Sequence, residues 1–145
     1  MFLVAGAFAI FGNVVAGRLS DHYGRRPTLV VALLLHWAGM IIFYNIGGPL
    51  LPVAWMIAIF CYFAIEVMMN AISGELFPTS CRTTAASLRT IVGILAAAAG
   101  LTVEGSLFQY FGDHGSAISV MVFSTLLAIP VVVFCLRETA NEHLH

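Results

Sequence analysis

The chain has 145 residues, of which 61% are hydrophobic and 9% are charged, and its net charge is −1. Soluble domains contain about 45–50% apolar and about 25% charged residues, and a body this small is mostly surface, so it cannot hide this much apolar side chain from water. The composition therefore excludes a soluble globular domain, and the absence of lysine and of any basic run argues against nucleic-acid binding.

Five apolar segments are long enough to cross about 30 Å of hydrocarbon as α-helices. They cover residues 2–18, 27–45, 53–75, 84–108 and 116–136. The connections between them are short and contain glycine, proline or polar residues, as turns between antiparallel helices do. The strict alternation of barrel strands is missing. The sequence predicts an all-α fold, a polytopic transmembrane bundle of five membrane-spanning helices in one domain over residues 1–145.

The first segment and the connection after it contain Asn13 and the stretch GRLSDHYGRRPTL, which begins at Gly17. Gly17 and Gly24 permit close helix approach and a tight turn, and Pro27 suits the first turn of the next helix. Asn13 is a candidate for a cavity-facing residue. The alternative for Asn13 is an interhelical hydrogen bond.

The third segment carries Glu66 near its middle. A charged side chain at that depth costs roughly 2.5 kcal/mol or more and usually faces a bundle interior or a wet cavity. At 100° per residue, Tyr62, Glu66, Asn70 and Ser73 lie on one face of this helix. We interpret Glu66, Asn70 and Tyr62 as candidates for a substrate or proton pathway, because burial favours the protonated carboxyl that proton coupling requires. The alternative is a protonated, hydrogen-bonded Glu66 with a structural role.

The remaining ionisable residues inside the predicted spans have simpler interpretations. Glu104, in the outer part of the fourth segment, shares a face with Gly93, Ala97 and Gly100, and this small-residue face predicts close packing. His36 lies midway along the second segment, where a proton relay and a packing role are both open. The three cysteines lack metal-ligand spacing. No metal site, no cofactor and no enzyme motif is predicted.

The arginines indicate how the chain crosses the membrane. They lie in the first connection, in or just after the third connection, and after the last segment: Arg18, Arg25, Arg26, Arg82, Arg89 and Arg137. With five crossings, all six fall on one face, which the positive-inside rule makes cytoplasmic. We expect the N-terminus outside, the C-terminus in the cytoplasm, and a multi-pass protein of the plasma (inner) membrane.

Two motifs together resemble the major facilitator superfamily. GRLSDHYGRRPTL is similar to the signature loop G-x-L-x-D-x-x-G-R-R/K of that family and matches it at Gly17, Leu19, Asp21, Gly24, Arg25 and Arg26. GELFPTSCR resembles the E-x-x-P-T-x-x-R segment of sugar porters and metabolite:proton symporters, with matches at Glu75, Pro78, Thr79 and Arg82. A weaker similarity links LRETA to the sequence that follows their last helix. The order of the motifs aligns the chain with helices eight to twelve of a twelve-helix fold.

The resemblance implies a function and a gating mechanism. Arg25, Glu75 and Arg82, together with Asp21 and Arg26, would form a cytoplasmic network that is intact when the cytoplasmic side is closed and broken when it opens. The alternative is a loop that only fixes topology. The implied activity is transport of a small solute (a sugar, an organic acid or a similar metabolite), coupled to a proton, by alternating access across the lipid bilayer.

The same resemblance implies that an N-terminal half, outside this chain, completes the solute pathway, so we expect no transport by this chain alone. Two other function classes stay open. One is a non-transporting membrane segment that packs against a partner, and the other is a drug or metabolite exporter. Further helices encoded upstream of Met1, with a second copy of the loop, would favour the transporter.

Overall fold

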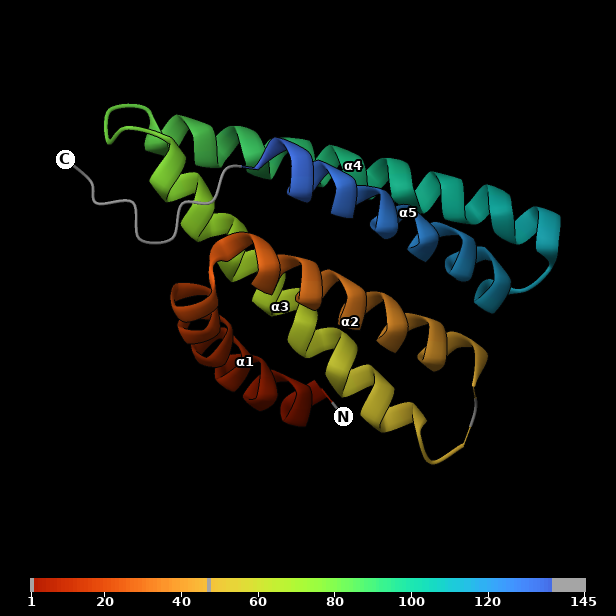
Figure 1. Ribbon diagram of the computed structural model, residues 1–145. Helices are drawn as coiled ribbons and strands as arrows, with labels where there is room; N and C mark the ends of the chain where they lie inside the picture. Colours follow the sequence, from red (N-terminus) through yellow and green to blue (C-terminus); the bar gives the residue numbers. More distant parts are fainter. Residues whose placement is uncertain (1, 47, 137–145) are drawn as a thin grey trace.

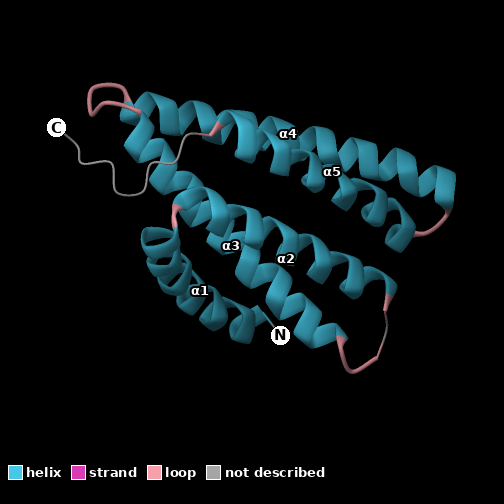
Figure 2. Cartoon of the chain, in the orientation of Figure 1, coloured by secondary structure: helices cyan, strands magenta, loops and turns pink. Residues whose placement is uncertain are grey.

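The computed structural model describes residues 2–46 and 48–136, with side chains from Ile10 onward. This part of the chain forms five helices, and Figure 2 shows no strand among its residues. The helices are α1 (Phe2–Tyr23), α2 (Arg25–Asn45), α3 (Leu51–Leu76), α4 (Arg82–Phe111) and α5 (His114–Cys135) (Figure 1). The predicted all-α fold is confirmed. Within the described residues, α2 to α5 are each long and apolar enough to cross a membrane.

The first connection differs most from the sequence expectation. The first predicted segment ends at residue 18, whereas α1 continues to Tyr23 and α2 begins at Arg25. The polar stretch is therefore helical on both sides of a single residue, Gly24. Asp21 at the end of α1 forms an ion pair with Arg25 at the start of α2, so these polar residues belong to two helix ends and not to a loop.

The core joins α1, α2, α3 and α5. Its buried members are Ala16, Leu29, Ala32, Leu33, Ala64, Met68, Ile72 and Val132. At Gly39 of α2 a Cβ atom would lie 3.2 Å from the carbonyl oxygen of Ala54 in α3. The absence of a side chain at Gly39 therefore allows these two helices to pack closely.

The fourth helix is attached differently from the others. Figure 1 shows α4 beside α5, on the far side of α5 and α2 from α1. None of the described residues of α4 is buried. Helices in lipid gain little from apolar contact alone, because the lipid is as apolar as the side chains. Polar contacts therefore have a large share in holding α4 to the rest of the bundle.

Candidate functional site

Gly24 sets the geometry of the signature loop. It is buried, and its φ of 103° lies in a region that residues with a Cβ atom rarely adopt. This conformation lets α2 begin immediately after α1, with Asp21 on the last turn of one helix and Arg25 on the first turn of the next. Gly17 has no such constraint, since a Cβ there would meet nothing within 4 Å. The expectation of close helix approach at Gly17 is therefore not met among the described residues.

Arg25 joins three helices at one end of the bundle. Its Nη1 lies 2.7 Å from Asp21 Oδ1 in α1, and its Nη2 lies 2.7 Å from Glu75 Oε1 in α3. Arg25 Nε also donates to Glu75 Oε1 at 3.2 Å, and Nη1 donates to the buried Ser20 hydroxyl at 2.7 Å. The Arg25 side chain is only 13% exposed. A cation at a helix N-terminus is unfavourable, so the two carboxylates offset both the helix dipole and the burial of the guanidinium.

The other two arginines of the predicted network have different surroundings. Arg26 donates a hydrogen bond from Nη2 to the carbonyl oxygen of Val133, near the C-terminal end of α5. Arg82 begins α4 and is exposed, and no carboxylate of the described residues lies within ion-pair distance of it. The structure thus brings Asp21, Arg25 and Glu75 together, directs Arg26 to α5, and leaves Arg82 apart.

A second polar contact lies deeper along α3. Glu66 Oε2 is 3.6 Å from Nη1 of Arg89 in α4, and Arg89 Nη2 donates to the side-chain oxygen of Asn70. Two of the predicted pathway residues therefore meet at one cation. The Nε of Arg89 is buried, and no hydrogen-bond partner for it is found among the described residues.

Arg89 is not among the site residues expected from the sequence, where this arginine indicates only the topology. Arg89 lies inside the predicted fourth span, residues 84–108, and this position within a span could have identified it as a site residue. An arginine inside a span normally faces the bundle interior and pairs with another polar group. The mid-span carboxylate Glu66 was the available partner.

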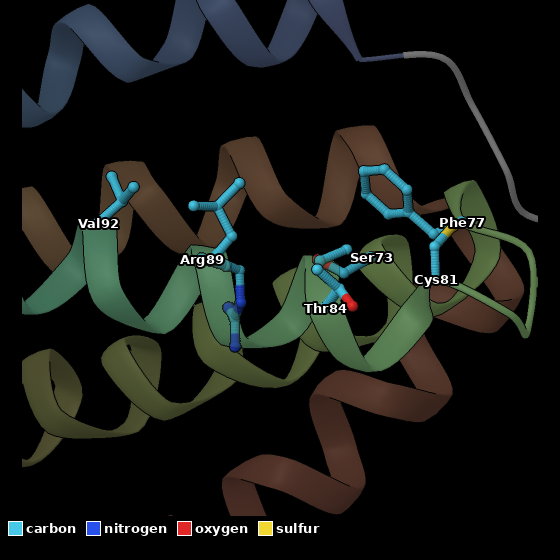
Figure 3. A pocket seen from close by; sticks show the side chains of 8 residues that line it. Ser73, Phe77, Cys81, Thr84, Arg89 and Val92 are labelled. Carbon is cyan, nitrogen blue, oxygen red and sulfur yellow. The ribbon is translucent and has the colours of Figure 1, made fainter.

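A cavity of about 540 Å³ lies between α3 and α4 beside this contact. Figure 3 shows the guanidinium of Arg89 on the α3 side of α4, while Phe77 and Val92 extend toward the opposite side. The lining is mainly apolar, and its hydroxyl groups come from two residues. The residues around the cavity are Ser73, Phe77, Cys81, Thr84, Ala85, Leu88, Arg89 and Val92.

Tyr62 and Asn13, the last two predicted pathway residues, do not share the contact that Glu66 and Asn70 make with Arg89. Tyr62 lines a different cavity, of about 910 Å³, which also borders α2, α4 and α5. The ring of Tyr62 lies 6.3 Å from that of His36, whose Nδ1 is 3.0 Å from the Ala58 carbonyl oxygen. Asn13 in α1 has a buried side-chain oxygen for which no partner is found among the described residues.

The other end of α4 carries a third polar cluster. Glu104 Oε1 lies 2.8 Å from Nδ1 of His114, whose ring stacks on Phe108 at a centroid distance of 4.0 Å. Asp113 caps α5, because its Oδ2 accepts a hydrogen bond of 2.8 Å from the Ser116 amide. This hydrogen bond to the Ser116 backbone, with one from the Ser116 hydroxyl, lowers the pKa of Asp113 below its ordinary value. On the Glu104 face, a Cβ at Gly100 would lie 3.6 Å from Met121 Cε of α5, whereas a Cβ at Gly93 would meet nothing within 4 Å.

Comparison with known proteins identifies the family to which this chain belongs. The model of the major facilitator superfamily matches residues 1–144. The chain is also 34% identical over 113 residues to solute carrier family 22 member 12 of Homo sapiens. That alignment covers 74% of this chain and 19% of the relative, so the chain spans about a fifth of the relative's length. Because the family model covers almost every residue, the chain belongs to the major facilitator superfamily, whose multi-pass membrane proteins carry small solutes across membranes.

Proposed function

We propose that this chain forms one side of the solute pathway in a proton-coupled secondary active transporter that works by alternating access. Its five helices correspond to helices eight to twelve of the twelve-helix fold, in the sugar-porter and metabolite:proton symporter branch. The motif from Glu75 to Arg82 supports that branch. The helices that face this chain across the pathway come from the rest of the full-length protein.

The observation that carries the alternating-access mechanism is the position of Arg25. One largely buried guanidinium binds carboxylates of α1 and α3 at the end of the bundle that the arginine distribution makes cytoplasmic. Removing one partner of such a pair leaves a charge without compensation in a poorly solvated place. We therefore expect this contact to be either made or broken, as a latch between a closed and an open cytoplasmic side requires.

Proton coupling is assigned to Glu66. It lies in the middle of a membrane-spanning helix, and its side chain is 47% exposed on a face that the core of α1, α2 and α3 does not cover. Such a carboxylate can exchange a proton with water in the pathway. Its partner Arg89 belongs to the neighbouring helix, so protonation of Glu66 weakens one of the contacts that attach α4 to α3.

The test is proton movement driven by a solute. Vesicles containing the full-length protein and an internal pH-sensitive dye are exposed to glucose or to benzoate, as neutral and anionic probes. We expect one of them to drive proton entry in the wild type. Glu66→Gln should abolish proton entry and retain exchange of the labelled solute, because glutamine cannot carry the proton.

Glu104→Gln is the matched control, since it removes a carboxylate at the far end of α4, and it should leave proton entry unchanged. Proton entry that persists in Glu66→Gln would contradict the coupling role. The 145-residue chain alone should move neither probe. A full-length protein that moves neither probe would support a non-transporting module, and solute efflux driven by inward proton flow would support an exporter.

A further inference from the structure

Ser20 is a buried polar residue near the end of α1. It is completely shielded from solvent, whereas its neighbour Asp21 is exposed. The Ser20 hydroxyl accepts a hydrogen bond of 2.7 Å from Nη1 of Arg25, and the Ser20 carbonyl oxygen accepts one of 3.2 Å from the Gly24 amide. One residue of α1 therefore contacts both the glycine that turns the chain and the arginine that begins α2.

The hydroxyl of Ser20 is directed differently from those of Ser73 and Ser106. Those two serines each donate to the carbonyl oxygen four residues earlier in their own helix, which satisfies the hydroxyl locally. Ser20 shows no bond of this kind within the described residues, and its oxygen faces Arg25. A residue that only fills space needs no polar atom, and a buried hydroxyl without a partner is destabilising. The arginine therefore explains why a hydroxyl is buried here.

Arg25 makes contacts on two sides of its guanidinium. Nη1 faces α1, where it lies 2.7 Å from Asp21 Oδ1 and 2.7 Å from the Ser20 hydroxyl. Nε and Nη2 face α3, where they bind Glu75 Oε1 at 3.2 Å and 2.7 Å. Nη1 carries two N–H groups, so it can serve Asp21 and Ser20 at the same time. Because the guanidinium is a rigid plane, the anchoring of Nη1 determines which edge is directed at Glu75.

The two partners of Nη1 on α1 are not equivalent anchors. The Asp21 side chain is 66% exposed, and an ion pair this open to water contributes little, because solvent screens it. The Ser20 hydroxyl is buried, and one side-chain torsion fixes its position on the helix. A hydrogen bond to a charged group is strong in such a poorly solvated place. Ser20 is therefore the firmer of the two anchors.

We propose that Ser20 is a positioning residue of the Arg25–Glu75 contact, because its hydroxyl holds Arg25 with Nε and Nη2 directed at Glu75. This inference rests on the proposed function, since that contact is the one that closes the cytoplasmic side there. The signature pattern G-x-L-x-D-x-x-G-R-R/K leaves the place of Ser20 open, so the motif assigns it no role. Ser20 and Arg25 belong to the two helices joined by Gly24, whereas Glu75 belongs to α3. In the proposed mechanism, the Ser20 bond therefore persists when Glu75 moves away.

The experiment measures how fast phenylglyoxal, which attacks guanidinium groups, modifies Arg25 in the full-length protein in lipid vesicles. Mass spectrometry gives the rate at each arginine, and the exposed Arg82 of the same molecule is the internal reference. Ser20→Ala should raise the rate at Arg25 by about three- to tenfold, the effect of losing one hydrogen bond, and should leave Arg82 unchanged. Ser20→Cys should also raise the rate at Arg25, because the thiol fills the space but is a weak acceptor.

A double-mutant cycle with Glu75 separates positioning from packing. Glu75→Gln should itself raise the rate at Arg25, and the addition of Ser20→Ala should then change it by less than about twofold, because no carboxylate remains on α3 to which the guanidinium is directed. A Ser20 that only packed the helix end would give the same factor in both backgrounds. Ser106→Ala, which removes a serine that bonds its own helix, is the matched control and should leave Arg25 unchanged.

Wild-type protection of Arg25 in Ser20→Ala or in Ser20→Cys, or equal factors in the two backgrounds, would overturn the inference. Failure of the proposed function gives a different result. If Ser20→Ala exposes Arg25 as expected but Glu75→Gln leaves Cys81 as protected from a cytoplasmic thiol reagent as in the wild type, the positioning role stands and the latch is contradicted. If Glu75→Gln exposes Cys81 while Ser20→Ala leaves Arg25 protected, only the role of Ser20 is contradicted.

Discussion

At the scale of single residues, the buried glycine between α1 and α2 determines where the Arg25 contact forms. With φ of 103°, Gly24 reverses the chain within one residue and places the last turn of α1 against the first turn of α2. Asp21 and Arg25 then meet at 2.7 Å. The signature loop is therefore a pair of helix ends joined by one residue, and its charges are fixed by helices on both sides.

The first residue-scale prediction compares the two loop glycines. Gly24→Ala should lower the free energy of unfolding by about 1–3 kcal/mol, because alanine rarely adopts this backbone conformation. Gly17→Ala should be neutral or raise stability by up to about 1 kcal/mol, because this helical position has open space and alanine is the better helix former. Unfolding in detergent with added denaturant checks both values. Equal effects of the two substitutions would contradict the assigned role of Gly24.

At the scale of helices, α4 and α5 differ in how they are held. None of the described residues of α4 is buried, and its contacts include Arg89 with α3 and Glu104 with α5. The α5 helix packs Val132 into the core and begins at a capped turn. Because none of the described residues of α4 is buried, we expect its attachment to α3 to depend on the contact between Arg89 and Glu66.

The second prediction concerns the start of α5. Asp113→Ala should lower the melting temperature, because the side chain satisfies the Ser116 amide at the helix N-terminus. Asp113→Asn should retain most of the stability, since asparagine caps equally well. The pKa of Asp113 is lower in the folded protein than in the unfolded chain. Its contribution is therefore complete above the unfolded pKa and is lost as the pH falls through the folded pKa.

Thermal melts of the wild type and Asp113→Asn between neutral and acid pH test this linkage. The wild type should lose more stability on acidification than Asp113→Asn, whose cap does not titrate. A parallel loss in the two proteins would show that the cap does not depend on the ionised carboxylate.

At the scale of the whole molecule, much of the architecture followed from the sequence. Five apolar segments and their short connections predicted the five helices, because apolar length is a strong signal in a membrane protein. The pairing of Arg25 with Glu75 followed from the family resemblance, and the structure shows this contact. Helix ends were less predictable, since the polar residues that normally indicate loops are helical here.

The partners of Arg26, Arg82 and Arg89 depended on how the helices pack. Sequence spacing places all three near one side of the membrane, but it does not specify which neighbouring helix each one reaches. Packing directs Arg26 to the carbonyl oxygen of Val133 and Arg89 to Glu66, two contacts between residues far apart in the sequence. Tyr62 shares a helical face with Glu66 yet borders a different cavity, which residues of α2, α4 and α5 also line.

In the proposed mechanism, the Arg25–Glu75 contact keeps the cytoplasmic side closed. The native Cys81, between α3 and α4, reports on it directly, because it is half-buried beside Phe77 in the cavity between those helices. A membrane-impermeant thiol reagent is added to the cytoplasmic side of oriented vesicles that hold the full-length protein. Alkylation of Cys81 and of the exposed Cys135 is followed by mass spectrometry.

Glu75→Gln should increase the alkylation rate of Cys81 by about 5–30-fold, the effect of a loss of one or two kcal/mol, and should leave Cys135 unchanged. A Cys81 rate that is the same in the wild type and in Glu75→Gln would contradict the latch.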